Sequence, residues 1–98
     1  MEKPYTIAEI RNRITTTAQQ YGIQRAYLFG SYARGEAEHD SDIDICIEKG
    51  KIRTLLDLSG FYLDLEKSLQ HKVDVVTTDG IDKDFKNEIE KEFVVIYG

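Results

Sequence analysis

Two aspartates stand where their carboxylates could bind a divalent metal ion. Asp42 and Asp44 are two residues apart in the run Ser41-Asp42-Ile43-Asp44-Ile45. Side chains in a strand alternate between its two faces, so both carboxylates are expected on one side. The two isoleucines then point to the opposite side, into a core. Paired carboxylates on a rigid strand are suitable ligands for a hard cation such as Mg²⁺.

A glycine turn lies ahead of these aspartates, with ten residues between Ser31 and Asp42. The apolar run 26–29 predicts a buried strand that ends at this turn. Gly30 allows the backbone to approach a ligand closely, and Ser31 is expected to cap a short helix that follows it. A helix start presents free N–H groups and a partial positive charge, which suits a phosphate. The turn and the carboxylates together indicate a nucleotide site that uses a divalent metal.

A third aspartate, Asp74, interrupts the valine-rich segment 71–77, which predicts a strand. Alternation places Val73, Val75 and Thr77 on one face and Asp74 and Val76 on the other. An aspartate within such a strand is costly unless it is paired or bound to a cation. The position of Asp74 is therefore informative.

The string Gly30-Ser31-Tyr32-Ala33-Arg34-Gly35, followed by Ser41-Asp42-Ile43-Asp44, resembles the signature of the DNA polymerase β nucleotidyltransferase superfamily. It is most similar to the minimal nucleotidyltransferases of bacteria and archaea. These are commonly the antitoxin halves of toxin–antitoxin pairs whose other member is a HEPN-domain protein. The resemblance implies an α/β (α+β) nucleotidyltransferase fold. Such a fold has a small mixed sheet of about four strands, with helices packed mainly on one face.

The resemblance also implies roles for individual residues. The expected catalytic residues and metal ligands are the three aspartates, Asp42, Asp44 and Asp74. Two Mg²⁺ ions held there would clamp the attacking and leaving oxygens of a nucleotidyl transfer. Three clustered carboxylates would repel one another without a cation, which favours a metal site. Gly30 and Ser31 are expected to hold the β- and γ-phosphates of ATP. Arg34 is either a phosphate or partner contact, or a surface salt-bridge residue.

Three functions fit these residues. Relatives in the resembled family silence a HEPN ribonuclease toxin by transferring AMP from ATP to one of its tyrosines. A second hypothesis is a non-catalytic antitoxin that neutralises its partner by occlusion. A third is a catalytic subunit that modifies a small molecule such as an aminoglycoside. The catalytic-looking domain takes up nearly the whole chain, so for either catalytic function we expect another chain to supply the acceptor.

The elements that must position these residues are indicated by caps and periodicity. Thr6 and Glu9 form a capping box at the start of a helix that Gly22 is expected to end. Its apolar stripe consists of Ile7, Ile10, Ile14, Ala18 and Tyr21. Strands are predicted at 24–29, 42–48 and 71–77, helices at 54–70 and 81–92, and a strand or helix extension at 93–97.

The two later helices have weaker patterns. The inward-facing residues predicted for the first are Leu55, Leu58, Tyr62, Leu65 and Leu69, widened by Leu56 and Leu63. In the second, Phe85 and Ile89 are expected to face inward. His39 is expected to be a solvated loop residue rather than a metal ligand, since no second histidine lies at ligand spacing. Gly50-Lys51 lacks the rest of a Walker A motif, so we reject a phosphate loop there.

The length and composition of the chain limit the number of domains and the classes of protein to which it can belong. The chain has 98 residues, with 41% hydrophobic and 32% charged residues and a net charge of −5. This predicts one domain spanning 1–98 and argues against a general nucleic-acid-binding surface. No apolar run is long enough to span a membrane, and Met1 to Pro4 lack a signal-peptide core. One cysteine, Cys46, is expected to be a buried hydrophobe in a cytoplasmic protein.

Overall fold

The computed structural model describes residues 3–98, so Met1 and Glu2, at the end where no signal peptide is expected, lie outside the described residues. Helices and strands follow one another along the chain. Their bounds are α1 Ile7–Tyr21, β1 Arg25–Phe29, α2 Gly30–Arg34, β2 Ile43–Glu48, α3 Leu55–Leu69, β3 Val73–Thr77, α4 Lys83–Glu90 and β4 Val94–Tyr97. None of the helices in this part of the chain combines the length and the apolar character needed to cross a membrane.

The four strands form one mixed sheet in the order β3-β2-β1-β4. Central strand β1 pairs antiparallel with β2 and with β4. Strand β2 pairs parallel with β3, and α3 makes the crossover that a parallel pair requires. The expected mixed sheet of about four strands is confirmed. Since β2 has a neighbour on each side, its backbone is fixed along both edges.

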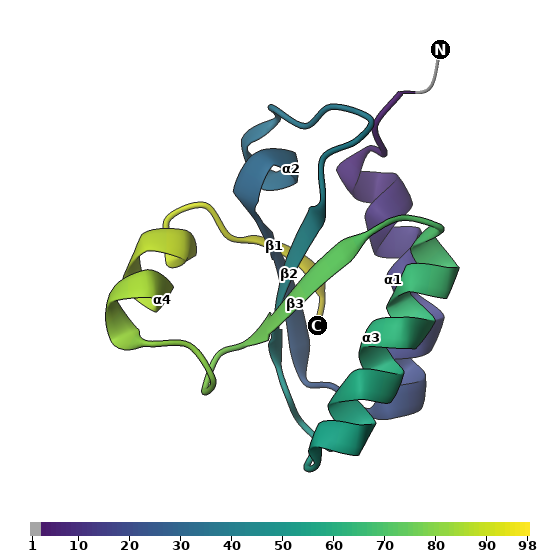
Figure 1. Cartoon of the computed structure of the whole chain (residues 1–98), viewed down its shortest axis with the longest axis vertical. Coiled ribbons are helices and arrows are strands. Elements are labelled where there is room, and N and C mark those ends of the chain that lie inside the picture. The colour runs from purple at the N-terminus through teal and green to yellow at the C-terminus, as the bar shows by residue number, and fades with distance from the viewer. Residues whose placement is uncertain (1–2) are drawn as a thin grey trace.

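Helices cover the two faces of the sheet unequally (Figure 1). Helices α1 and α3 lie side by side on one face, and α4 lies on the other. The larger core fills the space beneath α1 and α3 with buried residues that include Ile10, Ile14, Leu28, Ile43, Ile45, Ile47, Phe61, Leu65 and Leu69. A smaller core under α4 consists of Phe29, Cys46 and Ile89. The prediction that helices pack mainly on one face is therefore confirmed.

The first helix follows its sequence pattern closely. Thr6 accepts a hydrogen bond from the Glu9 backbone N–H at 3.1 Å, and Glu9 accepts one from the Thr6 N–H at 2.9 Å. The capping box is thus complete. Gly22, with φ 64°, ends the helix in the left-handed conformation, and its N–H donates to the last turn.

The apolar face predicted for α3 is partly wrong. Leu65 and Leu69 are buried as expected, but Leu55, Leu56 and Leu63 are exposed, at 84%, 83% and 56% respectively. Phe61 is 1% exposed and directs the helix toward the core, so residues Leu56 and Leu63, about half a turn away, face solvent. The burial of one large aromatic side chain therefore determines which face of α3 packs on the core, even though more leucines were predicted to face inward.

The last two elements also differ in part from expectation. Ile89 is buried, but Phe85 is 42% exposed and packs against the Phe29 ring in a T-shaped arrangement. Residues 94–97 form a strand rather than a helix extension, because they pair with β1.

Cys46 is fully buried, and this burial raises the pKa of its thiol to about 11. It therefore behaves as the small hydrophobe that the sequence predicts.

The capping box gives a direct test of the start of α1. Thr6→Ala should lower the free energy of unfolding by about 1 kcal/mol, because it leaves a helix N–H group without its acceptor. Thr16→Ala is the control, since Thr16 is an exposed residue of the same helix and should change stability little. Urea unfolding followed by circular dichroism measures both. Equal effects in the two variants would contradict a capping role for Thr6.

Candidate active site

The sheet brings together the three aspartates that the sequence singles out. Asp44 lies in β2, and its register partner in the neighbouring parallel strand β3 is Asp74. Asp42 lies just before β2, two residues from Asp44. Residues paired in this way project to the same side of a sheet, so all three carboxylates belong to one face. The prediction that the third aspartate lies on an adjacent strand agrees with this register.

The core fixes which face the carboxylates occupy. Ile43, Ile45 and Ile47 alternate along β2 with Asp44, Cys46 and Glu48 and are fully buried beneath α1 and α3. A shift of one residue would expose these isoleucines, so the register of β2 is strongly specified. Asp44 consequently lies on the α4 side of the sheet and is half-buried, whereas Asp42 and Asp74 are exposed.

Asp74 corrects one step of the sequence argument. Its carboxylate is exposed at the edge of the sheet, since β3 is an outer strand. The desolvation cost expected for an aspartate among valines therefore does not arise. Val73 and Val75 bury their side chains on the opposite face, against the core under α1 and α3. The remaining valine, Val76, lies on the same face as Asp74 and packs against the smaller core under α4.

Asp44 is the electrostatic centre of the site. Partial burial, followed by the negative charges of Asp74 and Asp42, raises the pKa of its carboxyl to about 6. The Arg34 guanidinium opposes these effects only in part, and Glu92 adds to them. A cation placed among these carboxylates would remove the repulsion and favour the ionised form of Asp44.

Gly30 lies directly against Asp44. Phe29 is the register partner of Asp44 across the β1–β2 pair, so the next residue turns beside the carboxylate. Gly30 has φ 74°, and a Cβ atom built there would overlap the Asp44 carboxylate. Both the backbone conformation and the available space therefore require glycine. The sequence predicts a close approach of Gly30 to a ligand, and the structure shows a close approach to the Asp44 side chain.

The donors beside Gly30 are engaged by a glutamate. The Gly30 N–H donates to Glu92 Oε1 at 2.8 Å, and Arg34 Nη1 donates to Glu92 Oε2 at 3.0 Å. Arg34 also pairs through Nε with Glu36 at 2.6 Å. The hydrogen bond from Gly30, and that from Arg34, lower the pKa of Glu92. Arg34 therefore forms salt bridges in this structure, as one of the two alternatives predicted. No motif or spacing in the sequence pointed to Glu92 as its partner.

Ser31 does not cap α2. The helix begins at Gly30, its N-cap residue is Phe29, and no side chain caps its first turn. The positive φ of Gly30 turns the chain one residue earlier than expected, which places Ser31 inside the helix. With five residues, α2 also contributes little macrodipole. The main anion-binding groups here are the Gly30 N–H and the Arg34 guanidinium.

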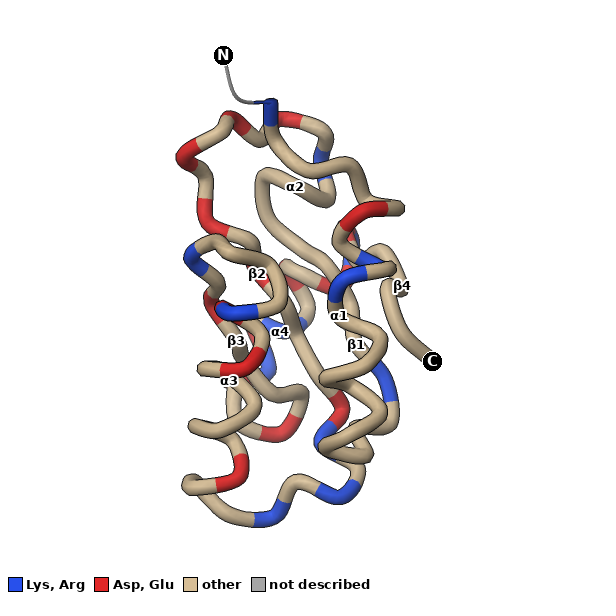
Figure 2. The backbone as a smooth tube through the Cα atoms, turned by 90° about the vertical axis from the view of Figure 1, so that its right-hand side faces the viewer, with Lys and Arg blue, Asp and Glu red and all other residues tan. Residues whose placement is uncertain are grey.

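The donor set suits a hard divalent cation. Acidic positions run along the loop 35–42 between α2 and β2 toward the aspartates (Figure 2). Within residues 3–98, however, no three His, Cys, Asp or Glu side chains gather closely enough to hold a metal ion by themselves. Asp42, Asp44 and Asp74 supply oxygen ligands of the kind Mg²⁺ prefers, and Mg²⁺ commonly takes its remaining ligands from phosphates and water. His39 lies exposed in the loop.

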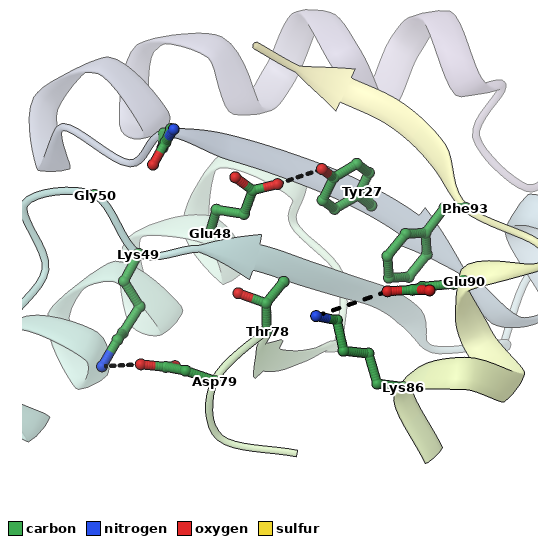
Figure 3. Close-up of a pocket in the computed structure, with 10 residues that line it drawn as sticks. Tyr27, Glu48, Lys49, Gly50, Thr78, Asp79, Lys86, Glu90 and Phe93 are labelled. Atoms are coloured by element: carbon green, nitrogen blue, oxygen red, sulfur yellow. Dashed lines mark hydrogen bonds and ion pairs between the residues drawn. The ribbon is translucent and has the colours of Figure 1, made fainter. Parts of the chain in front are cut away.

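A cavity of about 730 Å³ lies elsewhere, at the far end of β2 (Figure 3). It contains none of the predicted site residues. Lys49 pairs with Asp79 at 3.0 Å and Lys86 with Glu90 at 3.7 Å, so the lysines drawn there already contact carboxylates. We therefore take the aspartate cluster, rather than this cavity, as the chemical site.

Known proteins resemble this chain over most of its length. Residues 12–98 match the family described as polymerase beta, nucleotidyltransferase. A relative from Methanocaldococcus jannaschii, named as an inferred protein adenylyltransferase, is 42% identical over 90% of this chain and 95% of its own length. Protein adenylyltransferase MntA of Thermococcus cleftensis is 30% identical over 93% of this chain and 96% of its own length.

Solved structures share the fold. One described as an inferred minimal nucleotidyltransferase has a TM-score of 0.78 and 31% identity, covering 92% of this chain and 95% of that one. A toxin–antitoxin complex with AMP-PNP has a TM-score of 0.77 at 23% identity, covering 90% of this chain and 73% of that one. At that identity the likeness establishes the fold alone.

Glycine substitutions separate backbone strain from steric overlap at the site. Gly35 has the same φ of 74° as Gly30, but a Cβ atom there would meet nothing within 4 Å. Gly35→Ala should therefore cost about 1 kcal/mol of unfolding free energy, from strain alone. Gly30→Ala should cost about 3 kcal/mol, because the methyl group also displaces the Asp44 carboxylate. Urea unfolding measures the difference, and equal costs would contradict the contact.

Asp44→Asn should stabilise the metal-free protein above about pH 7, by about 1–2 kcal/mol after allowance for solvent screening. The pKa of Asp44 is raised from 3.8 to about 6, so the folded state favours the protonated carboxyl. Wild-type stability is then lost as the pH rises through this interval. The gain in the variant should therefore shrink toward pH 4.

Thermal unfolding in the presence of a chelator, at several pH values, tests this expectation. Asp40→Asn is the control, because it removes an exposed carboxylate from the same loop. Adding Mg²⁺ should stabilise the wild type more than the Asp44 variant. A variant that is less stable than the wild type at every pH would show that Asp44 is not repelled by its neighbours.

Proposed function

Because this chain belongs to the polymerase β nucleotidyltransferase family, we propose that it transfers AMP from ATP to a hydroxyl group of a HEPN-domain partner protein. The chain is a nucleotidyltransferase. The proposal adds the nucleotide, the acceptor and an antitoxin role. One observation supports it most directly: Asp44 and Asp74 are register partners on the adjacent strands β2 and β3, and Gly30 lies against the Asp44 carboxylate.

The relatives favour a protein as the acceptor. The Thermococcus cleftensis protein is named a protein adenylyltransferase, and its similarity to this chain extends over nearly both full lengths. Solved structures with the same fold include a complex described as a tri-AMPylated HEPN toxin with its antitoxin. We infer a tyrosine hydroxyl as the acceptor and a hetero-oligomer as the assembly. The single free thiol, Cys46, is consistent with a reducing cytoplasm.

Mg²⁺ would be held by Asp42, Asp44 and Asp74, where it would neutralise charge on the triphosphate and on the leaving pyrophosphate. Asp42 and Asp44, two residues apart on one strand, are the ligands we assign to the ion that accompanies the triphosphate. The half-buried carboxylate of Asp44 lies against Gly30, in the turn that would hold the phosphates. Gly30, Ser31 and Arg34 are the phosphate-binding residues of the proposal.

Asp74 would act on the acceptor. Its carboxylate is exposed on the edge strand β3, where a hydroxyl from another chain can reach it. In the proposed step the acceptor oxygen forms a bond to the α-phosphorus, and the bond from that phosphorus to the bridging oxygen breaks. Pyrophosphate leaves, and Asp74 accepts the proton of the hydroxyl.

Label transfer tests this function. The protein, Mg²⁺ and the protein encoded by the neighbouring gene are incubated with ATP labelled at the α- or the γ-phosphate. Label should reach the partner from α-labelled ATP only, because pyrophosphate carries the γ-phosphate away. The double variant Asp42→Asn/Asp44→Asn should reduce the rate by at least about 100-fold, since it removes the proposed metal ligands.

Controls distinguish the alternative functions. Asp40→Asn, which alters an exposed loop carboxylate, should leave the transfer rate nearly unchanged. Tight binding of the partner without any label would contradict the proposal and favour neutralisation by occlusion. Label that appears only on an added aminoglycoside would instead favour a subunit that modifies small molecules.

A further inference from the structure

Glu92 lies in the short turn between α4 and β4, and no part of the reaction described above uses it. Its side chain is 24% exposed. One carboxylate accepts the Gly30 N–H at 2.8 Å and the Arg34 guanidinium at 3.0 Å and 3.3 Å. Glu92 is 62 residues from Gly30 and 58 from Arg34 in the sequence, so the fold alone creates this contact.

The two donors that Glu92 engages are those that an incoming phosphate would need. A backbone N–H beside a guanidinium binds carboxylate and phosphate oxygens in the same manner, through charge-assisted hydrogen bonds. Both donors also lie next to the metal-binding carboxylates, since Gly30 contacts Asp44 and the charges of Arg34 and Glu92 act on its pKa. Glu92 therefore occupies an anion position inside the proposed active site.

We propose that Glu92 is an internal competitor for the nucleotide, which the triphosphate must displace from Gly30 and Arg34 in order to bind. This inference rests on the proposed function, because it takes a nucleoside triphosphate as the ligand. The exchange replaces one anion with another, so the positive charge of Arg34 remains compensated before and after binding. The residue thus sets the affinity of the site for phosphate without contacting the reacting atoms.

The neighbouring aspartates make the site selective for metal-bound phosphates. An anion without a metal meets the negative charges of Asp42, Asp44 and Asp74 and must also displace Glu92. A nucleotide that arrives with Mg²⁺ brings positive charge to the aspartates and offers phosphate oxygens to Arg34 and Gly30. Metal-free phosphates should therefore compete poorly with the nucleotide–metal complex.

Glu36 provides a matched control. It pairs with the same guanidinium, through Arg34 Nε at 2.6 Å, but it makes no contact with the Gly30 N–H. Glu36→Gln and Glu92→Gln each remove one negative charge next to Arg34 and preserve the shape of the side chain. Only the second variant removes the carboxylate from the anion position.

The test is calorimetric binding of a Mg²⁺-bound, non-hydrolysable ATP analogue to the wild type and both variants. Glu92→Gln should bind about threefold to tenfold more tightly, because a neutral amide competes less well than a carboxylate for charged donors. Glu36→Gln should change the affinity by less than about twofold, as expected for an exposed ion pair. Unchanged or weaker binding by Glu92→Gln would overturn the inference.

A structural readout separates competition from loss of local order. The amide resonance of Gly30 should shift in wild-type protein when the analogue is added, and it should already be displaced in Glu92→Gln without ligand. Thermal unfolding confirms that this variant is folded, and Glu92→Ala serves as a second variant if it is not. Nucleotide binding by the wild type with no change at Gly30 would overturn the inference but not the proposed function. No nucleotide binding by any variant would overturn both.

Discussion

Repulsion between carboxylates on neighbouring strands is the constraint around which this structure is organised. Asp44 and Asp74 are register partners, and Asp42 adds a third charge nearby. Groups that repel can be kept together only by a scaffold whose own stability exceeds the cost. Strand β2 provides it, because it is paired along both edges and anchored by three fully buried isoleucines, Ile43, Ile45 and Ile47. The protein thus stores unfavourable electrostatic energy at the point where a cation can release it.

Much of this arrangement could be predicted because it depends on local periodicity. The alternation of Asp42, Ile43 and Asp44 places the carboxylates on one face, and the capping box starts α1 where the sequence indicates. Strand order and the pairing of Asp44 with Asp74 arise from contacts distant in sequence, which no spacing rule supplies. Glu92 was missed for the same reason, since nothing in its neighbours marks it as the partner of Gly30 and Arg34.

The predictions that were wrong share a physical cause. Leu56 and Leu63 were counted into the buried face of α3 by their hydrophobicity, but the burial of Phe61 orients the helix differently. Ser31 was expected to cap α2 because of its residue type, yet the turn at Gly30 begins the helix before it. In both cases one local feature, the burial of Phe61 or the turn at Gly30, outweighs the preference of a residue type for its predicted position. Such a preference contributes a few tenths of a kcal/mol to about 1 kcal/mol of free energy.

The contact between Gly30 and Asp44 limits which residues related sequences can carry at position 30. The residue carries no functional group, yet the Asp44 carboxylate fills the volume that any side chain at this position would need. A descendant chain can lose an aspartate and keep its fold, but it cannot gain a side chain at position 30 while that carboxylate stays in place. Once catalysis is no longer selected and the carboxylate is lost, the steric requirement is removed, and only the strain of the positive φ still favours glycine. Among divergent copies, a residue other than glycine at this position would therefore mark a lineage in which the metal site has already been abandoned.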